Sequence, residues 1–417
     1  SSEQQVDIAG CKTFKKIAMT SLINPKFLFR LMLLLTIYTV TVHAQKNKVT
    51  NAVQFKKHVI SKAFVSEGAT VGDVNNDGKE DILAGNYWWE APLWKQHLLH
   101  ADTLDPVPGY RTSFLNYCMD VNNDGWNDLI KFDQPGGVCR WYQNPKNKKG
   151  LWQGHTILAS AGMENPGFVD VDNNGRMDLI CNDVNTRQVI WLQSPVAVND
   201  TIWQRHVISN DSMRATDRYT HGLGWGDVNK DGSKDVIIKS GWWESPADVT
   251  IANWTFHPAN LGADCANMFA YDVDEDSDMD ILSSSAHQYG IWWHEQIVAA
   301  DGSINWSTHE ISKLFSQSHA LAFTDINGDG YPDLVTGKRY LAHQDGHDPG
   351  SYEPAVLYWF EYIPGKDPQW IPHLIDDNSG VGNSIVVKDI NGDKLPDIIV
   401  SNKKGVYFFE QAKQVVK

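Results

Sequence analysis

A nine-residue acidic motif recurs seven times along this chain of 417 residues, and it constrains the fold more than any other feature. The motif has the form Asp-x-Asn/Asp-x-Asp/Asn-Gly-x-x-Asp, and its copies begin at Asp73, Asp120, Asp170, Asp227, Asp272, Asp325 and Asp389. The spacing between neighbouring copies is that of β-propeller blades, in which a small sheet is repeated around a central axis. The repeat therefore predicts a periodic fold built from one unit.

Each motif lies within a repeating pattern of strands. A short stretch of small and apolar residues precedes it (68–72 in the first copy) and an aliphatic run follows it (81–85), which is typical of a hairpin of two buried strands. An aromatic strand comes next, and a fourth strand carries Trp-x-x-His, as at Trp94 and His97. We therefore predict an all-β fold, a seven-bladed β-propeller with four-stranded blades.

The two ends of the chain are expected to share the last blade. After the seventh motif the sequence stops at an aromatic strand (407–409), with no fourth strand left, while Phe55-x-x-His58 is a spare copy of the fourth-strand pattern. We predict that residues 53–60 complete the last blade. Such a closure removes an exposed sheet edge that would invite aggregation.

The first 44 residues have the features of a targeting segment. Lys26 and Arg30 precede an apolar run (31–42) that is short for a bilayer span, and Ala44 ends a small-residue cleavage site. We expect residues 1–44 to be a signal peptide with an upstream extension, and residues 45–417 to form the propeller domain. The protein is then expected to be secreted, periplasmic or extracellular, monomeric, and free of the membrane after cleavage.

Net charge argues against one class of binding partner, and the spacing of the cysteines argues against a cysteine-bound metal. The chain has a net charge of −15, and subtracting the +3 of the targeting segment leaves −18 on residues 45–417, which argues against a nucleic-acid partner. Four cysteines remain after processing, on expected strands and at no metal-binding spacing: Cys118, Cys139, Cys181 and Cys265. We interpret them as buried free thiols, with disulfides as the alternative.

The seven motifs resemble the FG-GAP or VCBS repeats of integrin-type propellers, and the resemblance covers nearly all of residues 45–417. In that family the loop binds calcium through side chains at positions one, three, five and nine and a backbone carbonyl at position seven. Oxygen ligands clustered in a tight turn suit calcium, and glycine at position six permits the sharp bend. The motif lacks the Glu at position twelve of an EF-hand, so we expect a structural site rather than a sensor.

The resemblance implies up to seven structural calcium sites. An Asx-rich hairpin without an ion is the alternative. Ser277 and Lys394 replace the glycine at position six, where a left-handed backbone costs about 1–2 kcal/mol, so these two sites should be the weakest. The candidate ligands are Asp73, Asn75, Asp77, Asp81, Asp120, Asn122, Asp124, Asp128, Asp170, Asp172, Asn174, Asp178, Asp227, Asn229, Asp231, Asp235, Asp272, Asp274, Asp276, Asp280, Asp325, Asn327, Asp329, Asp333, Asp389, Asn391, Asp393 and Asp397.

The repeat also shows which face is free for another function. In an antiparallel blade the motif joins strands one and two, so the turn between strands two and three and the crossover to the next blade lie on the opposite face. The longest insertion, 340–355, falls on that face and carries His343, His347, Asp348 and Glu353. Six residues before each motif, where the inner strands meet the central cavity, the register gives Glu67, Phe114, Glu164, His221, Ala266, His319 and Asn383.

These polar side chains suit proton abstraction beside a carbonyl or carboxylate: a base takes the proton, cations hold the enolate charge, and an acid protonates the leaving oxygen. Three segments, 218–232, 318–330 and 336–350, resemble the propeller of fungal aldos-2-ulose dehydratases and of secreted propeller lyases that act on uronate glycans. Those dehydratases carry further domains, so the resemblance concerns the propeller alone. It implies a carbohydrate substrate and β-elimination.

The predicted function is a carbohydrate lyase or dehydratase that acts on a uronate glycan or a keto-sugar. We expect His221 and His319 to serve as base and as electrophile or metal ligand, with the identity of any catalytic divalent metal left open. The expected acid is Tyr219 or Tyr289, and the charge stabilisers are Arg218, Lys338 and Arg339. The catalytic set also includes His287 and Glu164. The alternative is a non-catalytic propeller of integrin type that binds a glycan or a protein.

One further group of histidines is expected to be structural. It recurs once per blade on the outer strands, unlike His221 and His319, whose equivalents in other blades are different residues. Its members are His58, His97, His155, His206, His257, His309 and His373.

Overall fold

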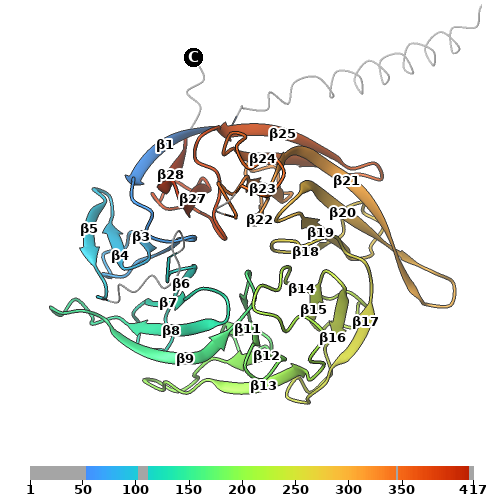
Figure 1. Ribbon diagram of the computed structural model, residues 1–417, viewed down its shortest axis with the longest axis horizontal. Coiled ribbons are helices and arrows are strands. Elements are labelled where there is room, and N and C mark those ends of the chain that lie inside the picture. The colour runs from blue at the N-terminus through green and yellow to red at the C-terminus, as the bar shows by residue number, and fades with distance from the viewer. Residues whose placement is uncertain (1–52, 102–110, 344–345, 413–417) are drawn as a thin grey trace, which may run out of the picture. The chain divides into compact units, whose positions relative to one another are not determined.

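The computed structural model describes residues 53–101, 111–343 and 346–412. The expected targeting segment, 1–44, lies outside the described residues. Every regular element of the described part is a β-strand, so the fold is all-β as predicted. Figure 1 shows the sheets of the described residues arranged in chain order around a central axis, with β6 (Leu115–Met119), β14 (Gly224–Gly226), β18 (Phe269–Tyr271) and β22 (Leu321–Thr324) nearest the centre of their groups.

The 28 strands fall into groups of four that follow one another along the chain. The first groups are β2 (Thr70–Gly72), β3 (Asp81–Ala84), β4 (Tyr87–Glu90) and β5 (Lys95–Leu98); β6 (Leu115–Met119), β7 (Asp128–Phe132), β8 (Gly137–Gln143) and β9 (Gln153–Ala161); β10 (Gly167–Val169), β11 (Asp178–Asp183), β12 (Gln188–Gln193) and β13 (Gln204–Ser209); and β14 (Gly224–Gly226), β15 (Asp235–Ile238), β16 (Gly241–Glu244) and β17 (Thr255–Pro258).

The remaining groups complete the ring. They are β18 (Phe269–Tyr271), β19 (Asp280–Ser284), β20 (Tyr289–Val298) and β21 (Ile304–Ser316); β22 (Leu321–Thr324), β23 (Asp333–Gly337), β24 (Leu357–Ile363) and β25 (Gln369–Asp376); and β26 (Ile385–Lys388), β27 (Asp397–Asn402), β28 (Gly405–Ala412) and β1 (Gln54–Ser61). All these pairings within a group are antiparallel, as a four-stranded blade requires.

The hydrogen-bonded sheets number six, five of four strands and one of eight. The eight-stranded sheet holds β6–β9 and β10–β13, which are joined by a single residue pair between Asp183 and Ala161. Seven groups of four strands are therefore counted only when this sheet is divided at that pair.

The two ends of the described chain meet in one sheet, as predicted. Strand β1 pairs with β28 in the order β1-β28-β27-β26, with a register that runs from Gln54 opposite Ala412 to Ser61 opposite Val406. The outer strand of this sheet therefore comes from the N-terminal side of the propeller, and β28 has no exposed edge.

The acidic motifs close their hairpins with a repeated set of backbone contacts. In the first copy, the Asp73 carboxylate accepts hydrogen bonds from the backbone N–H groups of Asp77 (3.2 Å) and Gly78 (2.8 Å). The ninth residue, Asp81, is fully buried and accepts from the backbone N–H groups of Val74 (3.2 Å) and Ala91 (2.9 Å). These bonds tie the loop both to its own hairpin and to the end of the third strand.

The ninth aspartate makes the same pair of bonds in the other six copies, at Asp128, Asp178, Asp235, Asp280, Asp333 and Asp397. Burial raises the pKa of these carboxyl groups, to about 6 for Asp81 and about 7 for Asp128. The ninth position is therefore a structural member of every hairpin, whether or not an ion is bound.

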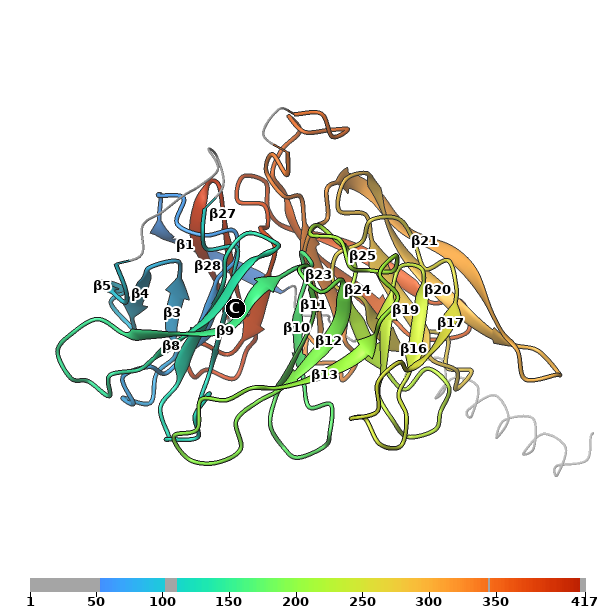
Figure 2. The same ribbon diagram turned by 60° about the horizontal axis from the view of Figure 1, so that its bottom comes forward.

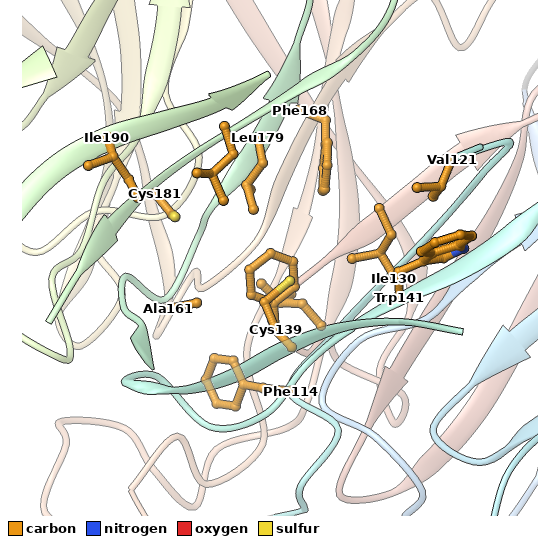
Figure 3. Close-up of a cluster of buried hydrophobic side chains, with 13 residues drawn as sticks. Phe114, Val121, Ile130, Cys139, Trp141, Ala161, Phe168, Leu179, Cys181 and Ile190 are labelled. Atoms are coloured by element: carbon orange, nitrogen blue, oxygen red, sulfur yellow. The ribbon is translucent and has the colours of Figure 1, made fainter. Parts of the chain in front are cut away.

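Apolar side chains fill the space between neighbouring groups of strands. Figure 3 shows one such cluster between β6–β9 and β10–β13, where Ile130 and Trp141 lie in the same core as Leu179 and Cys181, all fully buried. Cys181, like Cys118, Cys139 and Cys265, is a free thiol. This packing fixes the positions of the inner strands, and with them the residues at the central cavity.

The outer histidines belong to the framework of the sheets. His97 stacks on Trp88 of the neighbouring strand with ring centroids 4.3 Å apart, and its Nε2 atom lies 2.8 Å from the Glu90 carboxylate. His257 repeats the arrangement with Trp242 and Glu244. The structural interpretation of these residues agrees with their contacts.

Candidate active site in the central cavity

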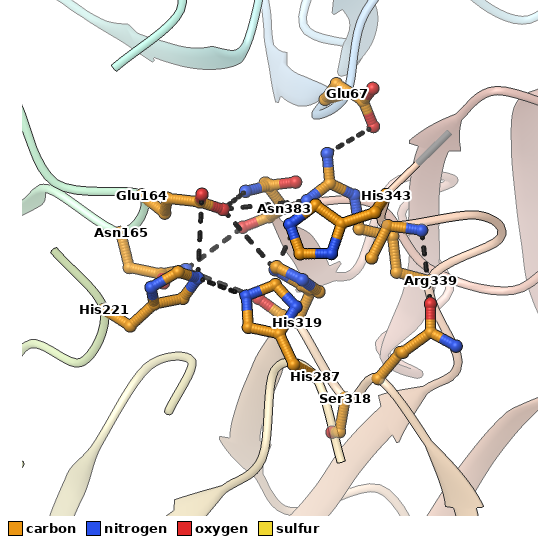
Figure 4. A network of polar contacts seen from close by, with 12 residues as sticks. Glu67, Glu164, Asn165, His221, His287, Ser318, His319, Arg339, His343 and Asn383 are labelled. Atoms are coloured by element: carbon orange, nitrogen blue, oxygen red, sulfur yellow. Dashed lines mark hydrogen bonds and ion pairs between the residues drawn. The ribbon is translucent and has the colours of Figure 1, made fainter. Parts of the chain in front are cut away.

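Three histidines from three different groups of strands meet near the axis of the propeller. His221 lies just before β14, His287 lies between β19 and β20, and His319 lies just before β22. One ring nitrogen from each lies within 4.8 Å of the other two, and Figure 4 shows the three rings facing one another. Because the inner strands converge on the axis, side chains that are distant in sequence are brought together here.

The cluster is tight, with His221 and His319 buried and His287 partly buried. His221 Nε2 lies 3.1 Å from His287 Nε2, and the ring centroids of His287 and His319 are 4.9 Å apart. His319 is fully buried and its Nε2 atom has no hydrogen-bond partner within the protein. A buried, unpartnered ring nitrogen is costly unless a ligand satisfies it.

Both deeply placed rings favour the neutral form. Burial lowers the pKa of His319 well below its usual value, and the adjacent Arg339 guanidinium acts in the same direction. Burial also lowers the pKa of His287, and the neighbouring His221 adds to the effect. Neutral imidazoles are the form in which histidine binds a divalent metal ion.

A carboxylate lies beside the histidine cluster. Glu164 places one oxygen 3.6 Å from His221 Nε2 and the other 3.6 Å from His319 Nδ1. The second oxygen also lies 3.6 Å from the Arg339 guanidinium and accepts a hydrogen bond from the Asn383 amide at 3.3 Å. Glu164 is therefore held against the cluster by a cation and an amide.

Arg339 links this carboxylate to a second, fully buried one. Its guanidinium lies 3.1 Å from Glu67, and Lys403 Nζ lies 3.9 Å from the same residue. Burial lowers the pKa of Lys403 to about 8. The alternation of Glu164, Arg339, Glu67 and Lys403 balances the charges below the cavity, so that none is left buried and unpaired.

A cavity of about 310 Å³ opens above these residues. Its walls are Phe114, Gln134, Pro135, Glu164, Tyr219, His221, His287, Arg339, Ala342 and His343. A second hollow of about 390 Å³ shares Tyr219 and His221 with it and extends toward Arg214 and Lys239. The two adjoin at Tyr219, whose side chain is half exposed. Pockets of this size accommodate small organic ligands.

Several predicted catalytic residues lie at this cavity and others do not. Glu164, His221, His287, Tyr219 and Arg339 line it, and His319 lies beneath it. Arg218 is not among the lining residues.

Two other candidates are engaged with the 340–355 insertion. The Tyr289 hydroxyl donates to Glu353 at 2.7 Å, and Lys338 binds the backbone carbonyls of Gly350 and Glu353. Neither lines the cavity. Both residues therefore anchor the insertion.

The predicted catalytic set omitted residues that the structure places in the network. Glu67 and Asn383 could have been chosen, because both occupy the register position that identified His221 and His319. His343 and Asp348 were placed on the cavity face by the sequence, but not in the catalytic set, and Lys403 was not singled out because it lies in a connection whose path the repeat does not determine.

Among the described residues, two acidic loops gather three carboxylates with oxygens within 4.8 Å of one another. They are Asp170, Asp172 and Asp178 in one motif, and Asp272, Asp274 and Asp276 in another. Hard oxygen ligands of this kind suit calcium. In the first of these loops the buried ninth residue, Asp178, lies close to the carboxylates at positions one and three.

The ring of four-stranded antiparallel sheets around a central cavity defines a β-propeller. A family model for FG-GAP-like repeats matches residues 120–181 and 253–336. The chain is therefore a β-propeller in which residues 120–181 and 253–336 are similar to FG-GAP-like repeats. Integrin alpha-8 of Mus musculus is 30% identical over 169 residues, a match that covers 31% of this chain and 15% of the integrin.

Two solved structures are similar to this chain at low sequence identity. A chain from the crystal structure of BBS1N in complex with ARL6DN, soaked with lead, has a TM-score of 0.49 at 8% identity, with 88% of this chain and 98% of that chain covered. The extracellular domain of a protein described as a hybrid two component system of B. thetaiotaomicron has a TM-score of 0.47 at 11% identity, with 85% and 41% covered. Among the described residues, no helix meets the length and hydropathy of a membrane span.

Proposed function

We propose that this protein is a secreted, calcium-stabilised carbohydrate lyase or dehydratase that acts by β-elimination in the central cavity. The observation that carries the proposal is the meeting of His221, His287 and His319 within 4.8 Å of one another, beside Glu164. The outer histidines recur once per blade, whereas the position shared by His221 and His319 holds other residues in the other five blades. Residues that depart from a repeat and converge on a cavity favour a site over a framework.

The three imidazoles suit a divalent transition metal. Their donor set is nitrogen, two of the rings favour the neutral form, and the Nε2 atom of His319 lacks a partner within the protein. A metal ion held there would supply a Lewis acid that draws negative charge from a substrate carbonyl or carboxylate. His221, His287 and His319 would be its ligands.

The remaining residues of the cavity take the proton steps. Glu164, at the cavity wall, removes the proton next to the carbonyl or carboxylate, and the Arg339 guanidinium lies 3.6 Å from it. Tyr219 presents a hydroxyl group at the half-exposed rim, where it protonates the departing oxygen. Breaking the bond between carbon and oxygen then leaves a double bond next to the carbonyl or carboxylate.

The two adjoining hollows favour a glycan over a single keto-sugar as the substrate. The central cavity and the hollow beyond Tyr219 share two residues, so a chain of sugars can continue from one into the other. The second hollow has one positive and one negative side chain at its edge, because Lys239 forms an ion pair with Asp264 there. Such a surface suits the hydroxyl groups of a sugar chain.

Calcium and secretion complete the proposal. The two loops with clustered carboxylates supply oxygen ligands for structural calcium, and the FG-GAP-like repeats and the similarity to an integrin support the same assignment. Integrin-like repeats and the basic and apolar segment before Ala44 favour an extracellular or periplasmic location.

The similarity to integrin alpha-8 favours one other function, a propeller that binds a glycan or protein without changing it. The two functions differ in the fate of the ligand. A binding propeller returns its ligand unchanged, whereas a lyase returns an unsaturated product.

The test is an ultraviolet absorbance screen of the purified protein on uronate glycans and keto-sugars. We expect an absorbing, unsaturated product from at least one uronate glycan, and a fall in rate of about 10²–10⁴-fold in Glu164→Gln. His257→Ala, which removes a framework histidine on an outer strand, is the matched control and should retain activity. A panel that yields saturable binding but no absorbing product would replace the lyase by the binding function.

A further inference from the structure

The insertion 340–355 between β23 and β24 is the longest departure from the repeat on the cavity face. It is held in place by buried polar side chains. Lys338, which is fully buried, binds two of its carbonyl oxygens, and the fully buried Gln317 accepts from the Ala342 N–H at 3.2 Å and donates to the Pro349 carbonyl at 3.4 Å. Figure 2 shows this segment (orange) protruding on the side away from the loop that joins β10 and β11.

The insertion brings one carboxylate against the histidine cluster. Asp348 is 8% exposed, and its Oδ1 atom lies 3.5 Å from His287 Nδ1. Both of its oxygens lie 3.0 Å from His343 Nδ1, and the His343 ring stacks on His287 with centroids 4.6 Å apart. His287 is thus covered on one face by His343 and bordered at Nδ1 by Asp348.

The two nitrogens of His287 therefore face different neighbours. Nε2 lies 3.1 Å from His221 Nε2, inside the cluster of three histidines, whereas the buried Nδ1 has no hydrogen-bond partner among the described residues and has Asp348 Oδ1 3.5 Å away. A carboxylate at Nδ1 favours the tautomer with hydrogen on that nitrogen and leaves the Nε2 lone pair free. A ring that ligates a metal through one nitrogen commonly donates to a carboxylate through the other, which fixes its orientation and raises its basicity.

We propose that Asp348 is a positioning residue that orients His287 for metal binding, and that the 340–355 insertion serves to deliver it. The inference rests on the proposed function for the metal ion itself. It adds that the metal affinity of the cluster depends on a carboxylate that does not touch the ion. Because His343 also pairs with Asp348, the same carboxylate holds both rings of the stacked pair.

The test is a cobalt titration of the full-length protein after removal of bound metal with a chelator. Affinity is measured by competition with a chelator, and the ligand field by the visible absorption of bound Co²⁺. We expect one Co²⁺ per chain at the cluster, and binding weaker by about 10–100-fold in Asp348→Ala, with a smaller loss in Asp348→Asn, whose amide oxygen can still accept a hydrogen bond. Asp217→Asn, an exposed carboxylate on the same face, is the matched control and should bind Co²⁺ as the unmodified protein does.

His343→Ala removes the second partner of Asp348 and should keep the cobalt affinity. Two results would contradict the role of Asp348 and leave the proposed function unaffected. One is an unchanged Co²⁺ affinity in Asp348→Ala. The other is a second equivalent of bound Co²⁺ that is lost in both Asp348→Ala and His343→Ala, because these residues would then be metal ligands. Folding of each variant is checked by its thermal unfolding midpoint. If the unmodified protein binds no Co²⁺, the metal is removed from the proposed function and this inference is removed with it.

Discussion

At the scale of single residues, the histidines form two groups, one with contacts inside its own sheet and one with contacts to other sheets. His97 and His257 stack on a tryptophan of the neighbouring strand and contact a glutamate of the same sheet, so each is satisfied within its own unit. His221 and His319 instead contact residues of other units, and both lie 3.6 Å from the Glu164 carboxylate. The repeat predicted this division, because a histidine recurs on the outer strand of every unit, whereas the position shared by His221 and His319 holds other residues in the other units.

The same register could not predict which tyrosine serves the cavity. Tyr219 and Tyr289 both lie on the cavity face, but Glu353 of the insertion binds the Tyr289 hydroxyl and raises its pKa above the usual value. The insertion has no counterpart in the other units, so the sequence pattern contained no information on that contact. The contact between Tyr289 and Glu353 depends on the path of the 340–355 insertion, which the repeat does not determine.

The two tyrosines give a test at this scale. Under the proposed mechanism, Tyr219→Phe removes the group that protonates the leaving oxygen, and kcat should fall by about 10²–10⁴-fold. Tyr289→Phe should leave kcat close to that of the unmodified protein, because its hydroxyl is engaged with Glu353. Steady-state rates on the best glycan of the screen measure both, and equal losses in the two variants would contradict the assignment.

At the scale of elements, the acidic hairpin was predicted more closely than any other part. Its position between two buried strands, its turn and its glycine follow from nine residues that are near in sequence. The structure adds that the ninth aspartate is tied to two backbone N–H groups, one of them at the end of the third strand, as in Asp81 with Ala91. That second bond spans two strands and is not visible in the motif.

The two irregular hairpins carry the expected backbone strain. Ser277 and Lys394 have φ values of 76° and 71°, in the left-handed region that glycine adopts without cost. Ser277→Gly should therefore raise the free energy of unfolding by about 1 kcal/mol. The reverse change, Gly78→Ala, should lower it by a similar amount, because Gly78 has a φ of 83° and an added Cβ meets no atom within 4 Å. Denaturant unfolding measures both, and a stabilisation by Gly78→Ala would contradict the argument.

At the scale of the whole molecule, one repeated unit and one closing strand explain most of the fold. The pairing of β1 with β28 was predicted from a missing fourth strand, and the structure has it. The joining of two groups into one eight-stranded sheet through Asp183 and Ala161 was not predicted, because it depends on the exact approach of neighbouring connections. The repeated sequence pattern therefore determines the order of the strands, whereas the link between two neighbouring units depends on individual residues such as Asp183 and Ala161.

Calcium should stabilise the whole propeller in a pH-dependent manner. In calcium-free protein, burial raises the pKa of Asp128, Asp235 and Asp333 to about 7, so their contribution to stability is full below the unfolded pKa of about 3.8 and is lost as pH rises through about 7. We expect the Tm in a chelator to fall over that range. The increase in Tm on adding calcium should grow over the same range, since calcium favours the ionised carboxylates. Thermal unfolding with and without calcium measures this, and a Tm that calcium does not change at any pH would contradict it.

We propose that three imidazoles from separate units form a metal-binding reactive centre at the central cavity. The most direct measurement is anomalous diffraction, at the cobalt edge, from a crystal of the protein grown with Co²⁺. We expect an anomalous peak from an ion coordinated by ring nitrogens of His221, His287 and His319, next to Glu164. A cavity floor with no peak, in which the three rings contact only one another, would contradict it.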